Sequence, residues 1–160
     1  MIQRIQTLYL LLVFVVSSIM LFLNPRFASF RQQDNPAKVS VEVQFVSNTT
    51  YNATDVGVDN PKLLNLILIV ALGLGAVVAV FLYKHTVVQR KICIYSVIAS
   101  FVLLAILFFD YYNIAGQRNN IPSYPGFHLV WPIVCAVFGF LAWSAIRRDE
   151  DLIKGMDRIR

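Results

Sequence analysis

Charged residues are scarce in this chain compared with what a soluble protein needs. Of 160 residues, 14% are charged and 58% are hydrophobic, whereas an average soluble domain has about a quarter charged residues and somewhat under half apolar ones. A soluble domain of this size also has a high surface-to-volume ratio and must cover that surface with polar groups. The composition therefore excludes an ordinary soluble domain and also an intrinsically disordered chain.

Cysteines and catalytic motifs are scarce as well. Cys93 and Cys135 form no CxxC or Cys/His cluster, and each lies in a hydrophobic run, as a small apolar filling residue does. A disulfide needs Cα atoms within about 7 Å, and these cysteines fall at different depths in two predicted helices, so we expect none. G-x-S-x-G, H-E-x-x-H and glycine-rich phosphate-loop motifs are missing from the sequence. We therefore expect no metal, no cofactor and no enzyme of these classes.

Long apolar runs are what the chain has in abundance. As a helix, the second run, with 21 residues, would span about 31 Å, close to the thickness of the membrane hydrocarbon. The runs lack the polar outer face that a soluble helical bundle requires. The sequence predicts an all-α membrane protein, a single left-handed bundle of four transmembrane helices within residues 1–160. The four predicted helices are Ile5–Leu23, Leu63–Tyr83, Ile92–Phe109 and Phe127–Ile146.

The first apolar run could instead belong to a signal peptide. Its length is at the upper limit for the hydrophobic part of a signal peptide, and no A-x-A-like cleavage site follows it. Cleavage after Ala28 would place Arg26 at the −3 position, where a small residue is expected. We therefore expect an uncleaved transmembrane helix.

The positions of the basic residues predict the orientation of these helices. By the positive-inside rule, short segments rich in Lys and Arg face the cytoplasm. The two longer connections hold only Arg26, Arg31, Lys38, Lys62 and Arg118. Both termini and the link between the second and third helices are therefore predicted to be cytoplasmic. Lys154 lies in the C-terminal tail. Each basic residue near the membrane surface would add about 1 kcal/mol of attraction to anionic lipid. The candidate contacts to such lipid or to a partner are Arg4, Lys84, Arg90, Lys91, Arg147, Arg148, Arg158 and Arg160.

The net charge of +5 could also suggest a nucleic-acid-binding protein. However, the basic residues flank apolar runs, and no aromatic-and-basic RNA motif accompanies them. Membrane topology explains them better, and we expect no nucleic-acid partner.

The connection 24–62 predicts a small extracytoplasmic β-hairpin. Val39–Val46 alternates apolar and polar residues, as a half-buried strand does, and Phe27–Arg31 can pair with it across a turn at Asp34–Pro36. Because an isolated hairpin is marginally stable, we expect it to rest on the helix ends. Residues 47–60 are polar and rich in turn residues, which predicts an irregular, mobile segment, and the connection 110–126 also carries turn signals.

Few residues are candidates for chemistry. His85 and His128 belong to opposite membrane faces and cannot share a metal ion. Asp110 ends the third run near the start of the fourth, so it could approach His128 and act on a lipid, although polar residues at a membrane interface more often anchor helix ends. No ionisable residue lies inside the membrane, which argues against a transporter. Asn65 is strongly polar and intramembrane, and a helix-to-helix hydrogen bond explains it most simply.

Small residues predict close helix packing, because they recur every four residues on the second run and offer a similar surface on the fourth. Gly73 and Gly75 could instead mark a broken helix of the kind found in transporters, but the recurrence favours packing. The sequence leaves open whether the packing partner is in this chain or in another protein. The predicted packing residues are Ala71, Gly75, Ala79, Cys135 and Gly139.

The tail from Asp149 predicts a short amphipathic cytoplasmic helix. Leu152, Ile153, Met156 and Ile159 fall on one helical face. Such a helix could lie at the lipid headgroups, bind a partner or form a solvated extension of the fourth helix.

Three segments resemble a known family. They are MIQRIQTLYLLL at the start, YK…QRKIC (from Tyr83) in the middle and LA…IRRDE…LI…DRIR (from Leu141) at the end. They are similar to small four-pass membrane proteins of the Bacteroidota that form a domain family of unknown function, and the similarity covers nearly the whole chain. His85 and Thr86 stand where Asn-Arg is expected, so one basic contact is missing there. The resemblance implies a bacterial inner membrane and four helices, and it implies no known activity.

Together these observations predict a non-enzymatic accessory or assembly subunit of a membrane complex. Its expected partners are the lipid bilayer and either a membrane protein or a second copy of the chain. The alternative is a binder or carrier of a lipid or other hydrophobic ligand, held in a crevice between the helices near Asn65. A third reading is an enzyme that acts on lipid around Asp110 and His128.

Overall fold

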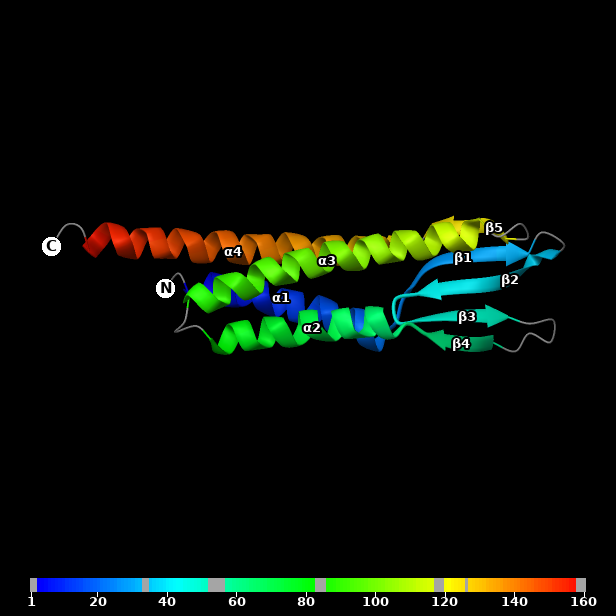
Figure 1. The fold of residues 1–160 in the computed structure, drawn as a ribbon, viewed down its shortest axis with the longest axis horizontal. Coiled ribbons are helices and arrows are strands. Elements are labelled where there is room, and N and C mark those ends of the chain that lie inside the picture. Colours follow the sequence, from blue (N-terminus) through cyan, green and yellow to red (C-terminus); the bar gives the residue numbers. More distant parts are fainter. Residues whose placement is uncertain are drawn as a thin grey trace.

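Four helices lie side by side along the long axis of the molecule, and a β-sheet extends from one end of them (Figure 1). The computed structural model describes residues 3–32, 35–51, 57–82, 86–116, 120–125 and 127–157. Both chain ends lie at the end of the bundle opposite the sheet (Figure 1). We call this the terminal end, and the other the sheet end.

The helices are α1 (Gln3–Phe22), α2 (Leu63–Phe81), α3 (Thr86–Ala115) and α4 (Val130–Asp157), the last preceded by the 3-10 turn η1 (Phe127–Leu129). Each contains a stretch long and apolar enough to cross a membrane: residues 5–22, 63–81, 87–115 and 130–149. A helix of 19 residues, the length of α2, spans about 28 Å, which is close to the hydrocarbon thickness.

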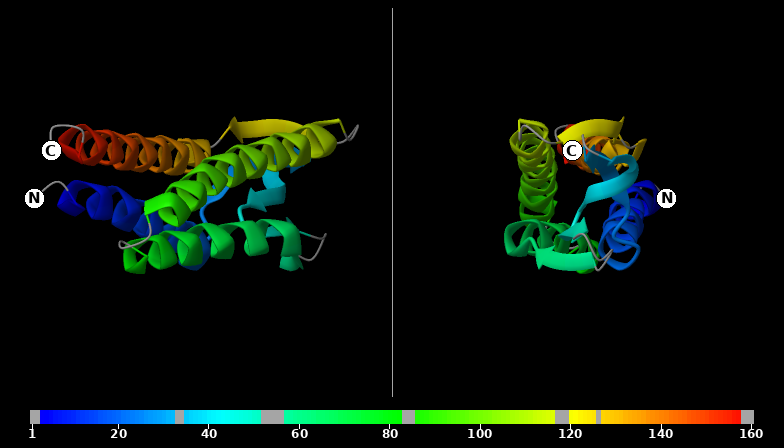
Figure 2. Two further views of the ribbon diagram at one scale, coloured as in Figure 1. Left: turned by 60° about the vertical axis from the view of Figure 1, so that its left-hand side comes forward. Right: turned by 90° about the vertical axis from the view of Figure 1, so that its right-hand side faces the viewer.

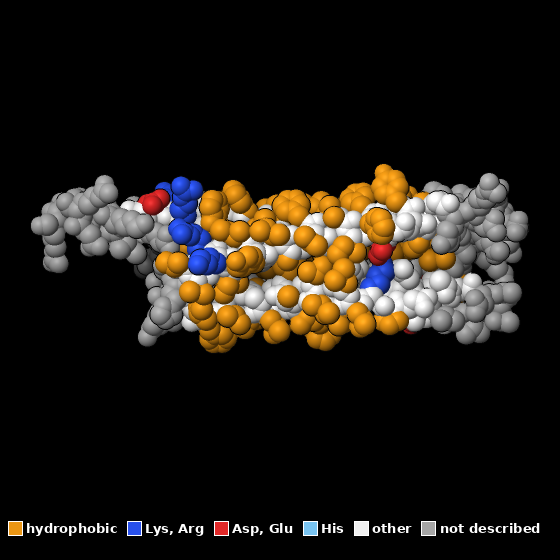
Figure 3. Space-filling model, viewed as in Figure 1, with side chains coloured by type: hydrophobic (Ala, Val, Ile, Leu, Met, Phe, Trp, Pro, Cys, Tyr) orange, Lys and Arg blue, Asp and Glu red, His pale blue; other side chains and the backbone are white. Residues whose placement is uncertain are grey.

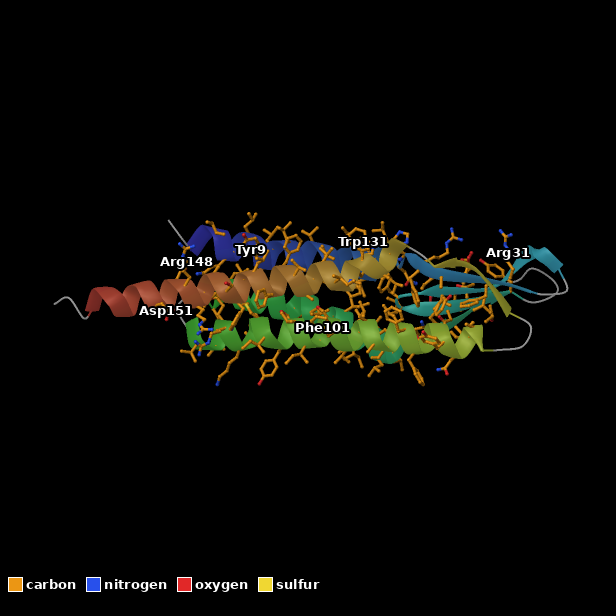
Figure 4. All side chains as sticks on the ribbon, turned by 90° about the horizontal axis from the view of Figure 1, so that it is seen from above. Tyr9, Arg31, Phe101, Trp131, Arg148 and Asp151 are labelled. Atoms are coloured by element: carbon orange, nitrogen blue, oxygen red, sulfur yellow. The ribbon has the colours of Figure 1, made fainter. Side chains whose placement is uncertain are left out.

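The helices form a ring in which α1 contacts α2 and α4, and α3 contacts α2 and α4. Figure 2 shows this arrangement end-on. The outer surface is as apolar as the interior: in the middle of α3, Phe101 is 59% exposed (Figure 4), and hydrophobic side chains cover the bundle as a broad belt (Figure 3). Such a surface requires lipid around it.

The two longest helices extend beyond their apolar runs. The third was expected over 92–109 and the fourth over 127–146, but α3 continues into polar residues at both its ends, and α4 runs without a break to Asp157. The tail therefore extends α4 as one helix to Asp157, within the residues that the structure describes. Hydrophobicity marks only the part of a helix that matches the hydrocarbon, so it does not locate helical turns in water.

The sheet has five antiparallel strands in the order β4-β3-β2-β1-β5. The predicted hairpin forms its centre, with Phe30 opposite Val41. Of its predicted turn at Asp34–Pro36, Asn35 and Pro36 belong to strand β2 instead, and Asp34 lies outside the described ranges. The strands are β1 (Arg26–Gln32), β2 (Asn35–Gln44), β3 (Ser47–Tyr51), β4 (Gly57–Pro61) and β5 (Asn120–Pro125).

Strands β3 and β4 form in the region of residues 47–60, for which the sequence predicted a turn-rich, mobile segment and no strand, and they pair with each other. These strands are polar on both faces and lack the alternation that identifies a strand. Thr49 Oγ1 donates to Asp59 Oδ1 across them at 2.6 Å. The connection 110–126 also contributes a strand, β5, whose two prolines are tolerated because it lies at the edge of the sheet.

One continuous core joins the sheet to the helices. Phe27 and Phe45 contact each other with ring centres 5.9 Å apart, and Phe30 lies 5.4 Å from the ring of Tyr111 on α3. A second, smaller cluster lies toward the terminal end and contains Leu10, Ala79, Cys93, Ala142 and Ile146. Cys93 is in the second cluster and Cys135 in the first, and both are free thiols.

Candidate functional sites at the two ends of the bundle

A half-buried ion pair joins the helices to the sheet. Lys62, between β4 and α2, places Nζ 2.8 Å from Oδ2 of Asp110 on α3, and the two side chains are only 12% and 25% exposed. The same ammonium donates to the backbone oxygen of Gln44 at 3.2 Å and lies 5.5 Å from the centre of the Phe27 ring. We call these four residues the junction cluster. It ties α2, α3 and two strands together at one point.

The two partners of this pair depend on each other. Burial lowers the pKa of Lys62 below its ordinary value of 10.5, while the hydrogen bond and the charge of Asp110 act in the opposite direction. The carboxylate therefore offsets the cost of holding an ammonium away from water. Each charged group forms its ion pair with the other, as expected for an interaction that stabilises the fold.

Asn24 secures the end of α1 to the sheet. Its φ of 40° is a left-handed conformation, which Asn tolerates better than most residues. Its Nδ2 donates to Oε1 of Gln44 at 2.6 Å and to Oγ of Ser47 at 3.0 Å, and its Oδ1 accepts from the N–H of Val46 at 2.8 Å. The side chain thereby caps the turn from helix to strand.

Asn65 also connects a helix to the sheet. It is 1% exposed, and its Nδ2 donates to the backbone oxygen of Phe45 at 3.0 Å, where the sequence suggested a bond between helices. A cavity of about 140 Å³ at this end is smaller than the usual ~300 Å³ minimum of a small-molecule site, and Asn65 does not line it. Its lining residues are Phe27, Leu107, Phe108, Tyr111 and Leu129.

Asp110 and His128, suggested as a pair, are not joined by a hydrogen bond. Asp110 contacts Lys62 instead, and Nδ1 of His128 is buried with no hydrogen-bond partner among the described residues. His85 lies outside the described residues. Within the described ranges, no three His, Cys, Asp or Glu side chains are placed so that they could hold a metal ion.

The terminal end carries a groove between α1 and α4. It has a volume of about 500 Å³, and its polar members are Tyr9, Ser144, Arg148 and Asp149, beside apolar Ile5, Leu141 and Ala145. At its edge the side-chain amide of Gln6 on α1 donates to Oδ2 of Asp149, while Oδ1 of Asp149 is buried and has no hydrogen-bond partner in the part of the chain that the structure describes. Figure 4 shows Tyr9 and Arg148 near this end, far from the sheet.

The predicted basic contacts that the structure describes lie at the terminal end. Lys91, Arg147 and Arg148 are exposed and Arg90 is half-buried, and Lys and Arg side chains gather where the apolar belt ends (Figure 3). Arg147 lies over the ring of Trp143, 5.7 Å from its centre. Lys84, Arg158, Arg160 and the side chain of Arg4 lie outside what the structure describes.

The predicted packing residues have different surroundings. On α2, Ala71 is exposed, Gly75 half-buried and Ala79 buried, and the helix is unbroken at its glycines. On α4, Cys135 and Gly139 are buried. A Cβ at Gly139 would lie 3.0 Å from Oγ of Ser96 and 3.1 Å from Cγ2 of Val97 on α3, whereas one at Gly75 would have its nearest neighbour at an ordinary 3.7 Å.

Two important contacts were not anticipated from the sequence. Lys62 was counted only as a loop charge, although its place directly before an apolar run marks it as a residue at the membrane boundary. Gly73 approaches α1 closely, because a Cβ there would lie 3.0 Å from Oγ of Ser17. No spacing in the sequence links Gly73 to Ser17 or Lys62 to Asp110, since the members of each pair come from segments far apart in the chain.

Four helices that can span a membrane, an outer surface of apolar side chains and a sheet at one end define a multi-pass membrane protein. The chain belongs to the family described as a domain of unknown function, DUF4293, whose family model matches residues 2–159. A search of curated proteins gives no match.

Proposed function

We propose that this protein is a non-enzymatic accessory or assembly subunit of a complex in a bacterial inner membrane, with both termini in the cytoplasm. The observation that carries the proposal is the extension of α4. Gln6, near the start of α1, contacts Asp149, and α4 continues from there for eight residues to Asp157, about 12 Å. The extension projects past the other helices (Figure 1).

The sequence of this extension has the apolar pattern expected of a helix that binds another protein. Leu152, Ile153 and Met156 recur at helical spacing, a pattern that usually marks an apolar face buried against another element. The orientation is supported by the basic residues Arg90, Lys91, Arg147 and Arg148, which lie at the same end as both termini. Engagement of Asp110 by Lys62 supports the non-enzymatic part of the proposal, because the carboxylate is not free to act as a base.

The experiment is quantitative co-purification in mild detergent through an N-terminal tag. The full chain should recover a partner in fixed stoichiometry, and the double variant Ile153→Asp/Met156→Asp should lose it. Asp151→Asn, an exposed change on the same extension, is the matched control and should retain the partner. Recovery of the full chain alone and monomeric in several mild detergents would contradict the proposal.

A second candidate function is the binding of a lipid. It is favoured by the α1–α4 groove, whose volume of about 500 Å³ lies within the usual range of ligand sites, ~300–1,000 Å³. The groove lies at the terminal end rather than near Asn65, where a crevice was expected.

A further inference from the structure

We propose that the α1–α4 groove binds one phospholipid that carries a primary ammonium, with phosphatidylethanolamine as the probe. The inference rests on the second candidate function and gives it a site and a ligand class. It does not involve the α4 extension, so it can fail or succeed independently of the proposed partner.

The shape of the groove fits a lipid that lies between two helices. Its α4 wall consists of residues three or four positions apart, which therefore share one helical face, and Ile5 and Tyr9, also four apart, form the α1 wall. The α4 wall is made of Leu141, Ser144, Ala145, Arg148 and Asp149.

On the α4 wall, the charged residues lie at one end of the groove and an apolar residue at the other. Arg148 and Asp149 lie nearest the terminal end, Ser144 lies about 6 Å further into the bundle along α4, and Leu141 lies beyond it. The ring of Tyr9 then stacks on that of Phe138, with centres 6.5 Å apart. A phospholipid has the same order, with its headgroup at the membrane surface and its chains toward the middle.

Arg148 and Ser144 supply the groups that a phosphate needs. The guanidinium of Arg148 is exposed and borders the groove, and guanidinium binds phosphate through paired charge-assisted hydrogen bonds. The hydroxyl of Ser144 lies one turn away on the same face and can donate to a further phosphate oxygen. Both would act on any phospholipid, whatever its headgroup.

Asp149 supplies the selectivity. Its Oδ2 accepts from Gln6, and the half-buried carboxylate borders the groove beside Arg148. A carboxylate in this position favours a cationic donor. A primary ammonium carries N–H groups that it can donate to this carboxylate, whereas a quaternary ammonium has none. Adjacent positive and negative side chains thus match a zwitterionic headgroup.

The level of the groove in the membrane is also suitable. Arg147 and Lys91 are exposed at the same end as Arg148, and the basic side chains there mark the edge of the apolar belt (Figure 3). Basic residues at such an edge lie at the depth of lipid headgroups.

The test is native mass spectrometry of the full chain in detergent with phosphatidylethanolamine, phosphatidylcholine or phosphatidylglycerol of identical acyl chains. The wild type should retain phosphatidylethanolamine about tenfold better than phosphatidylcholine, as expected for one charge-assisted hydrogen bond. Asp149→Asn should remove this preference. Arg148→Gln should lower retention of all three lipids by about tenfold.

Arg147→Gln is the matched control, because Arg147 is the neighbouring arginine but lies over Trp143 rather than in the groove. It should leave binding unchanged, and thermal unfolding should show that every variant is folded. Equal retention of the three lipids by the wild type would overturn the proposal, as would an equal loss in Arg147→Gln and Arg148→Gln.

Ser144→Phe, which fills the groove from an exposed position, should abolish binding, and its failure to do so would place the lipid elsewhere. Ile153→Asp/Met156→Asp should keep the lipid preference even where it loses the partner.

Discussion

Separating Lys62 from Asp110 should destabilise the protein more than any exposed charge change. Asp110→Asn removes the negative charge beside the Lys62 ammonium, whose side chain is 12% exposed. Removing one partner of a buried pair costs about 3–5 kcal/mol, and a charged hydrogen bond about 1.5–3 kcal/mol. Because water can reach part of this site, we expect a loss of about 3 kcal/mol of unfolding free energy. Lys62→Met should cost about 1–2 kcal/mol, because the more exposed Asp110 recovers hydration.

The double variant Lys62→Met/Asp110→Leu distinguishes pairing from packing. Replacing both partners with apolar residues is often near neutral, so its stability should lie within about 1 kcal/mol of the wild type, whereas the losses of the two single variants would add up to about 4–5 kcal/mol. Unfolding in mixed detergent, followed by circular dichroism, measures all three. Lys91→Met, at an exposed lysine, should change stability by under about 0.5 kcal/mol. Additive losses in the double variant would refute the reasoning.

The same pair should make stability depend on alkaline pH. Since the folded pKa of Lys62 is below 10.5, the unfolded chain binds more protons between the folded value and 10.5. The stability of the wild type relative to Lys62→Met should therefore rise with pH through that interval and level off above it. A relative stability that falls across this interval would contradict the burial of Lys62.

Three further outcomes are expected from the contacts described above. Gly139→Ala should lower the free energy of unfolding by about 1–2 kcal/mol through overpacking. Gly75→Ala should leave it unchanged or raise it by up to about 1 kcal/mol through helix propensity. Unfolding in detergent compares the two variants, and equal effects would contradict the close approach at Gly139. Asn24→Ala should destabilise the protein more than Asn24→Gly, because both lose the hydrogen bonds but only Ala also strains the left-handed backbone. The reverse order in the same assay would show that the left-handed conformation at residue 24 does not contribute to the loss of stability. A membrane-impermeant maleimide applied to spheroplasts should label Asn60→Cys and leave Asp151→Cys unlabelled until lysis; the opposite pattern would reverse the proposed orientation.

The helices could be predicted from the sequence because lipid imposes one requirement at every exposed position. Apart from Asn65, the residues of α2 that face the bundle interior and those that face the bilayer are both apolar or small, so hydropathy alone locates the helix. Strand β2 was also predictable, since Val41, Val43 and Phe45 face the core and alternate with polar residues. In both cases a local pattern reports the environment.

The rest of the sheet and the junction cluster were not predictable because their patterns are not local. The polar strands β3 and β4 are held by backbone pairing and a Thr49–Asp59 hydrogen bond, which leave no periodicity in the sequence. Asp110 was correctly seen to end an apolar run, but His128 was suggested as its neighbour because helices three and four are adjacent. Its actual partner, Lys62, comes from a strand-to-helix link whose position depends on the whole sheet.

The place of β5 in the sheet has a consequence for biosynthesis. Strands β1 to β4 come from the connection between α1 and α2, but β1 finds its second neighbour only in β5, between α3 and α4. During synthesis the backbone groups on that edge of β1 have no partner strand until α2, α3 and then β5 have been made. Pairing of such distant segments is slow, and an open strand edge attracts other chains. The last strand to be synthesised, β5, is thus the one that covers the open edge of the first, β1.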